Sequence, residues 1–113
     1  TAENQTLSNP MYVHSIPTNN DNQDIVSMGA NSALMTKKVI QNSFEVLSIG
    51  LISAIQAVDY LKIKDQLSSK TSHYYSEFRE IVELIIEDKP RYTEMRNLTE
   101  HLKSKNLEQA AIN

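Results

Sequence analysis

Residues 19–24 of this chain bring side-chain amides and carboxylates close together, in the run Asn-Asn-Asp-Asn-Gln-Asp. Asn19, Asn22 and Gln23 each carry hydrogen-bond donors and acceptors on one side chain, so together they can bind the ammonium and the carboxylate of a small zwitterion. The run leads directly into an apolar-periodic stretch that begins at Ile25. The sequence therefore predicts a polar binding segment at the start of a long helix.

A purely structural interpretation of these polar residues stays open. Asn and Asp are common in turns and at helix starts, because their side chains bond to neighbouring backbone groups. Asp21 or Asp24 can cap the helix in this way. The preceding Ser15–Thr18 is interpreted as shaping the loop, since Pro17 fixes its own φ and restricts Ile16 to extended conformations. Such rigidity would aim the amides that follow, as a binding site requires.

The segment as a whole resembles the active-site segment of the ammonia-lyases and 2,3-aminomutases that use a methylidene-imidazolone (MIO) electrophile. That family includes the histidine, phenylalanine and tyrosine ammonia-lyases. Three pieces carry the resemblance: Ser-Ile-Pro-Thr at Ser15–Thr18, Asn-Gln-Asp at Asn22–Asp24 and Val-Ser-Met-Gly at Val26–Gly29. Over the rest of residues 9–103 the resemblance lies in the order and length of the helices.

The resemblance implies roles for three amides. Asn19, Asn22 and Gln23 would bind the substrate, and Gln23 would also act in catalysis. In the phenylalanine- and tyrosine-type enzymes an Asn-Gln pair stands where Asn22 and Gln23 stand here, near the substrate amine and the prosthetic group, whereas histidine-type enzymes carry Gln-Glu. Asn19 is similar to the residue of bacterial tyrosine-lyase relatives. The resemblance thus favours an aromatic amino-acid substrate over histidine and leaves lyase and aminomutase both open.

The MIO group itself is not encoded here. In the family that the chain resembles, MIO forms from an Ala-Ser-Gly tripeptide, and this tripeptide does not occur in the 113 residues. We therefore expect the C-terminal part of a longer enzyme, inactive alone and completed by the missing N-terminal part. The resemblance implies that the parent is a homotetramer with a core of long helices. A helical oligomerisation module without chemistry of its own is the alternative from another class.

Composition excludes several other functions. A net charge of −3 argues against nucleic acid as a partner, because nucleic-acid binding calls for a basic patch. The absence of cysteine excludes disulfides and thiolate zinc sites, and fits a cytoplasmic protein. His14, His73 and His101 are far apart in the sequence, so no metal site is expected. The scarcity of glycine and proline, with two and three residues, is typical of helical proteins.

The apolar pattern predicts an all-α chain, with an extended loop at residues 1–24 and a helical segment at 25–113. The predicted helices run from Ile25 to about Leu61, from His73 to Glu87 with Ser72 as cap, and from Glu94 to Lys103 with Thr93 as cap. A row of carboxylates on the second helix is interpreted as a solvated face; it comprises Glu77, Glu80, Glu83 and Glu87.

The first predicted helix has an unusual distribution of apolar side chains. Between Phe44 and Leu61 they cover almost the whole circumference, which predicts burial on most sides. Two short helices cannot surround it, so other chains or other segments must. A membrane span is not expected, because only thirteen residues separate Glu45 from Asp59 and a span needs about 20.

Overall fold

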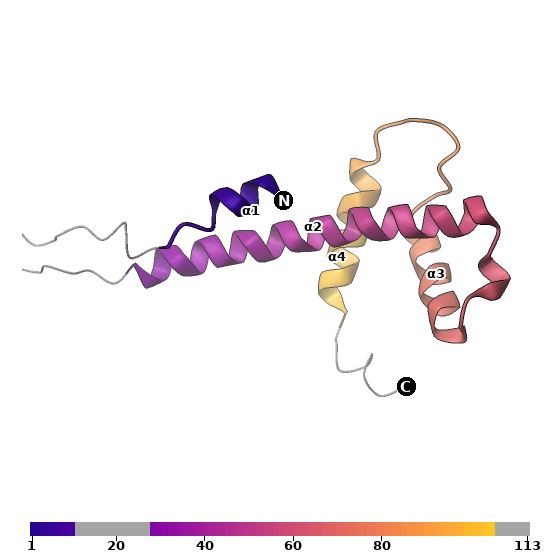
Figure 1. The fold of residues 1–113 in the computed structure, drawn as a ribbon, viewed down its shortest axis with the longest axis horizontal. Coiled ribbons are helices and arrows are strands. Elements are labelled where there is room, and N and C mark those ends of the chain that lie inside the picture. The colour runs from indigo at the N-terminus through magenta and orange to yellow at the C-terminus, as the bar shows by residue number, and fades with distance from the viewer. Residues whose placement is uncertain (11–27, 106–113) are drawn as a thin grey trace, which may run out of the picture. The chain divides into compact units, whose positions relative to one another are not determined.

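The computed structural model describes residues 1–10 and 28–105, and these form helices joined by short connections (Figure 1). In order, the elements are α1 (Ala2–Thr6), α2 (Gly29–Leu61), the 3-10 helix η2 (Lys64–Gln66), α3 (Ser69–Ile81) and α4 (Tyr92–Ser104). The predicted all-α class is confirmed, with no strand among the described residues. The chain divides into two compact units, Thr1–Ser43 and Phe44–Asn113, and α2 passes through the boundary between them.

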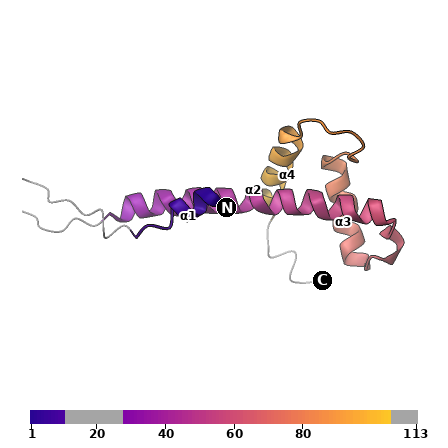
Figure 2. The ribbon, with the colours of Figure 1, turned by 45° about the horizontal axis from the view of Figure 1, so that its top comes forward.

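The first ten residues differ from the predicted extended loop, because Ala2–Thr6 forms the short helix α1. The apolar pattern did not reveal this helix, since none of its residues is buried. Five residues are too few to hold a helix by themselves. Contacts with α2 supply the support, and Figures 1 and 2 show α1 lying along the first half of α2. The remainder of the predicted loop, residues 11–24, lies outside the described residues.

The long helix α2 begins later than predicted and ends where predicted. Its first turn starts at Gly29 rather than Ile25, with the Met28 carbonyl accepting from the Ser32 N–H at 2.9 Å. At the other end, the Ile63 N–H donates to the Val58 carbonyl at 3.2 Å. Lys62 adopts the left-handed conformation with φ 56°. This combination closes a helix by satisfying its last carbonyls.

Much of the apolar surface of α2 is exposed within this chain. Exposed fractions are 53% at Ile40, 57% at Leu47 and 52% at Ile49. Helices α3 and α4 therefore cover only part of α2, as expected. By length and mean hydropathy α2 meets the requirements of a membrane span, although the spacing of Glu45 and Asp59 argued against one. The core helix of a soluble protein meets the same requirements.

Helix α3 begins and ends earlier than predicted. Its cap is Ser68, whose hydroxyl accepts from the Thr71 N–H at 3.2 Å, so the prediction of Ser72 as cap was wrong. The helix stops at Ile81 and Val82 is extended, with φ −118° and ψ 117°. Helical periodicity continued to residue 87, but contacts with α2 and with Arg79 hold the following backbone in an extended path, as described below.

Helix α4 spans Tyr92–Ser104, slightly longer at each end than predicted. Its N-cap is Arg91 without a side-chain cap bond, so the prediction of Thr93 as cap was wrong. The core of the unit 44–113 lies where α2, α3 and α4 meet. Its buried apolar residues are Ile55, Tyr75, Phe78, Val82 and Leu98.

Candidate functional site

The residues predicted to bind substrate, Asn19, Asn22 and Gln23, lie outside the described residues, as do Ser15–Thr18 and Asp24. The structure does describe the chain on both sides of them. On one side stand α1 and residues 7–10, and on the other stand Met28 and the first turn of α2. The candidate site is therefore built from what these flanking elements can do.

The first turn of α2 offers backbone N–H groups without an acceptor inside the helix, as every helix start does. It contains no acidic side chain, so nothing in it neutralises the positive end of the helix dipole. Such an end favours a negatively charged group nearby. In the sequence, Gln23 precedes Gly29 by only six positions. The electrostatics of this end thus favour an anionic group next to the first turn of α2.

A buried polar contact fixes α1 to α2 in the unit Thr1–Ser43. Asn42 of α2 is 7% exposed, and its Nδ2 donates to Glu3 Oε2 at 2.9 Å and to Asn4 Oδ1 at 2.8 Å. Lys38 Nζ lies 3.6 Å from Glu3 Oε1 on the exposed side of the same contact. Nothing local in the sequence indicated this arrangement, because Asn42 and Glu3 are 39 positions apart.

The unit 44–113 has a second polar network, centred on Asp59 of α2. Both Tyr75 and Arg79 of α3 bond to its carboxylate. The bond from the Tyr75 hydroxyl to Asp59 raises the pKa of Tyr75, and burial raises it further. Asp59 thereby joins α2 to α3, and the Arg79 guanidinium neutralises the negative charge that Asp59 places on the long helix. We interpret this network as structural.

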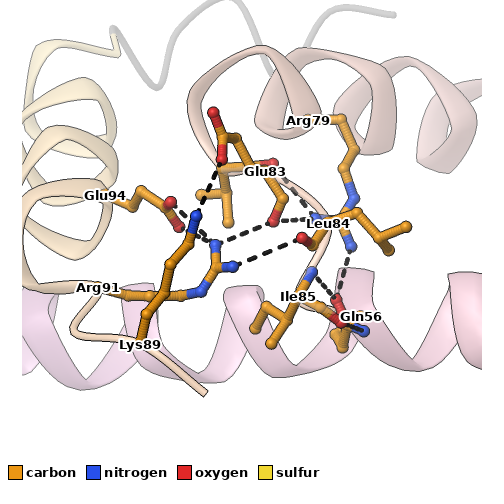
Figure 3. Close-up of polar contacts among 9 residues, drawn as sticks. Gln56, Arg79, Glu83, Leu84, Ile85, Lys89, Arg91 and Glu94 are labelled. Carbon is orange, nitrogen blue, oxygen red and sulfur yellow. Dashed lines mark hydrogen bonds and ion pairs between the residues drawn. The ribbon is translucent and has the colours of Figure 1, made fainter. Parts of the chain in front are cut away.

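The same network controls the connection between α3 and α4, residues 82–90 (Figure 3). Gln56 of α2 pairs with the backbone of Ile85 in both directions, donating to its carbonyl at 3.1 Å and accepting from its N–H at 3.1 Å. Arg79 donates to the carbonyls of Val82 and Glu83. From the N-cap of α4, Arg91 donates to the Glu83 carbonyl at 3.3 Å. Side chains from α2, from α3 and from the N-cap of α4 therefore form hydrogen bonds with this backbone. A longer α3 would have paired these backbone groups within the helix.

The predicted solvated row of glutamates is only partly correct. Glu83 and Glu87 lie beyond the end of α3 and cannot continue its face. Glu77 bonds to two basic groups of the α4 end, with His101 Nε2 and Lys105 Nζ each 2.6 Å from its carboxylate. Burial acts to raise the pKa of Glu77, but the hydrogen bonds from Lys105 and His101 outweigh it and the pKa is lowered.

Next to this cluster lies an apolar hollow of about 430 Å³ in the unit 44–113. Lys105, Thr71, Tyr74 and Tyr75 are the lining residues with polar groups. The ammonium of Lys105 lies 4.4 Å from the centre of the Tyr74 ring. The remaining lining is mostly core side chains such as Leu51 and Phe78. Among residues 1–10 and 28–105, no group of three His, Cys, Asp or Glu side chains is placed to hold a metal ion.

Comparison with known proteins identifies relatives along nearly the whole chain. A family model described as aromatic amino acid lyase matches residues 1–80. Histidine ammonia-lyase 1 of Fusobacterium nucleatum is 36% identical over 106 residues, which cover 94% of this chain and 20% of that enzyme. A histidine ammonia-lyase of Staphylococcus saprophyticus is 40% identical over 101 residues, covering 89% of this chain and 20% of that enzyme.

Among solved structures, tyrosine aminomutase from Streptomyces globisporus is similar in fold and in sequence. The TM-score is 0.83 at 34% identity, over 89% of this chain and 19% of that one. The chain spans about a fifth of the length of the relatives it matches. The residues matched by the family model include the whole amide segment, Asn19 to Asp24.

Proposed function

This chain belongs to the aromatic amino acid lyase family, and we propose that it serves as one part of a longer enzyme that removes or moves the amino group of an aromatic amino acid. The observation that carries the proposal is the family match over residues 1–80, which includes the amide segment. In the proposed enzyme, Asn19, Asn22 and Gln23 bind the ammonium and carboxylate of the substrate. The positive end of α2 contributes to holding the carboxylate.

Tyrosine or phenylalanine is the substrate that the amide segment supports. The pair Asn22-Gln23 matches the pattern of the phenylalanine- and tyrosine-type enzymes, and Asn19 agrees with it. The similarity to tyrosine aminomutase points the same way. Histidine is the second candidate, because histidine ammonia-lyases are 36% to 40% identical to this chain. An amide at position 23 can donate a hydrogen bond, whereas the Glu of the histidine-type pattern, when ionised, only accepts.

The residues of this chain do not form the MIO group of the family. Its precursor tripeptide, Ala-Ser-Gly, does not occur in them. The roles proposed for the chain therefore concern binding and orientation of the substrate, and the electrophile comes from sequence outside these 113 residues. The chain by itself is expected to be inert towards Phe and Tyr.

Assembly is the second contribution of the chain in this proposal. The exposed apolar side chains of α2 between residues 39 and 61 pack against a second copy or against the rest of the same polypeptide. The enzyme is proposed to be a cytoplasmic homo-oligomer that binds neither nucleic acid nor a membrane. Its acidic balance, with a net charge of −3 in this part, supports the exclusion of nucleic acid.

The proposal is tested with the full-length protein that contains this chain. Tyr, Phe and His are supplied in turn, formation of coumarate, cinnamate or urocanate is followed by ultraviolet absorbance, and β-amino acids are separated by chromatography. Turnover of Tyr or Phe above that of His supports the aromatic assignment. Turnover of His alone replaces it with the histidine assignment, and the absence of all four product types overturns the enzyme proposal.

Gln23→Ala in that protein tests the site residues. Losing one polar group that stabilises the transition state typically raises the barrier by ~2–4 kcal/mol. Turnover should therefore fall while the melting temperature stays within the range of the control Gln66→Ala, which changes an exposed residue of η2. A lowered melting temperature with unchanged kinetics would instead identify Gln23 as a structural cap.

A further inference from the structure

We propose that the apolar hollow in the unit 44–113 binds a small amphiphilic carboxylate, with Lys105 holding its anionic end. The hollow has a volume of about 430 Å³ and lies among α2, α3 and α4, where α3 and α4 both cross α2 (Figures 1 and 2). Ligand sites in proteins are typically apolar hollows of this size with a few polar groups that orient the ligand. The inference goes beyond the proposed function and involves no residue of the amide segment.

The lining of the hollow provides a preformed surface for an apolar body. Ile55, Tyr75 and Phe78 belong to this lining and to the core, with exposed fractions of 5%, 7% and 7%. Leu51 and Tyr74, which also line the hollow, are partly buried and pack against that core. Three of these five side chains are aromatic, so a flat apolar body such as a ring can pack against their faces and edges.

The charge of the lining selects the other end of the ligand. Among the described residues that line the hollow, Lys105 carries the only charge. Its side chain is 31% exposed, so a ligand can reach it from solvent. Its ammonium lies 4.4 Å from the centre of the Tyr74 ring, which also lines the hollow. The end of a ligand that lies next to Lys105 is therefore favoured when it is anionic and disfavoured when it is cationic.

Lys105 keeps hydrogen-bond donors for such an anionic group. Its ammonium has three N–H groups, and the hydrogen bond to Glu77 Oε2 at 2.6 Å uses one of them. The other oxygen of Glu77 lies 2.6 Å from His101 Nε2, and since an ionised carboxylate only accepts, His101 is the donor. Glu77 thus has a second donor besides Lys105. The carboxylate of a ligand can share the Lys105 ammonium with Glu77.

Two variants separate the charge from the space. Lys105→Gln removes the cation, and Thr71→Trp places a ring at an exposed lining residue of α3 to fill the hollow. If Thr71→Trp does not fold, Leu67→Trp, at a partly buried lining residue, takes its place. The matched control is Lys103→Gln. Lys103 lies in the last turn of α4, does not line the hollow and bonds to Glu100 at 2.9 Å.

The variants are made in the full-length protein, and binding is measured by titration calorimetry with indoleacetate and with its neutral amide, indoleacetamide. Lys105→Gln should weaken the binding of indoleacetate roughly tenfold, the lower end of what a hydrogen bond to a charged group contributes. It should leave the binding of indoleacetamide nearly unchanged. Thr71→Trp should weaken the binding of both compounds, and Lys103→Gln should match the unaltered protein.

Three results would overturn the inference. The first is the absence of indoleacetate binding by the unaltered protein, as expected if another part of the polypeptide fills the hollow. The second is an unchanged Kd in Thr71→Trp, which would place the binding elsewhere. The third is an equal effect of Lys105→Gln on both compounds, which would remove the charge from the recognition. A separate indoleacetate site, such as the proposed active site, would keep its Kd in every variant, and none of these results depends on catalysis.

Discussion

The hydroxyl oxygens of Ser48 on α2 and Thr99 on α4 lie 2.8 Å apart in the core, at 0% and 2% exposure. Each hydroxyl also lies within bonding distance of a carbonyl one turn earlier in its own helix, Phe44 for Ser48 and Met95 for Thr99. Two hydroxyl hydrogens cannot serve three contacts at once. The bond between the two helices therefore forms only when one hydroxyl leaves its own carbonyl.

This shared bond predicts coupling between the two residues. Thr99→Val should lower the free energy of unfolding by about 1 kcal/mol, the usual net contribution of one hydrogen bond. Adding Ser48→Ala should then cost less than it does alone, because the bond is already lost. Chemical denaturation of the four proteins measures the coupling. Ser53→Ala, which removes an exposed hydroxyl with only a bond to Ile49 in its own helix, serves as the control. Strict additivity of the two core changes would contradict the prediction.

The contact of Glu77 with the end of α4 predicts sensitivity to acid. Because its pKa is lowered in the folded chain by Lys105 and His101 against the effect of burial, the unfolded state binds the proton more readily. The stabilisation is present above the ordinary value of 4.5 and is lost as the pH falls below it. Glu77→Gln should flatten this part of the stability curve. The free energy of unfolding is measured by denaturation at pH 3 to 6. If it falls as steeply with pH in the variant as in the unaltered protein, other carboxylates are responsible.

The pairing of Gln56 with the Ile85 backbone predicts a local effect on the α3–α4 connection. Gln56→Leu removes a donor and an acceptor at once and leaves the Ile85 N–H and carbonyl unsatisfied, which should cost about 1–3 kcal/mol. The amide hydrogen of Ile85 should then exchange faster, while amides in the middle of α3 are affected less. Gln66→Ala, at an exposed position of η2, should stay within about 0.5 kcal/mol of the unaltered protein. Unchanged exchange at Ile85 would show that Arg79 and Arg91 hold the connection without Gln56.

The exposed apolar face of α2 predicts self-association of the isolated chain. We expect a dimer or tetramer built on residues 39–61, since burial contributes ~25 cal/mol per Å². Leu47→Glu, at a residue 57% exposed in the chain, should shift sedimentation toward the 12.8 kDa monomer without loss of helix. Ile55→Glu, at a core residue 5% exposed, should unfold the chain instead. A monomer at micromolar concentration, unchanged by Leu47→Glu, would contradict the prediction.

The sequence predicted best what depends on local pattern. The apolar periodicity of α2 located its end at Leu61, because the helix and its closing turn are set by neighbouring residues. Contacts between distant residues could not be anticipated in the same way. Glu77 looked like a member of a solvated row, yet its partner His101 lies 24 positions away. Asn42 looked like an ordinary helix residue for the same reason.

Helix α3 shows how a distant contact overrides a local pattern. Val82 and Ile85 continue the apolar spacing of the helix, and Val82 does reach the core at 0% exposure. It does so from an extended backbone, because Gln56, 29 positions before Ile85, binds the chain that follows. The role of the amides Asn19, Asn22 and Gln23 stays a prediction, which the enzymatic experiments above address.

Side chains that lie at or beyond the ends of the α3–α4 connection determine the path of its backbone. Gln56, Arg79 and Arg91 all bond to its backbone N–H or carbonyl groups, and the carbonyl is common to every amino acid. Ile86, at 83% exposure, plays no part in those bonds. Apart from the buried Val82, such a segment is free to exchange its own residues in evolution while it keeps its course. The same freedom marks residues 86–88 as a place to insert a label or a short epitope without rebuilding the helices on either side.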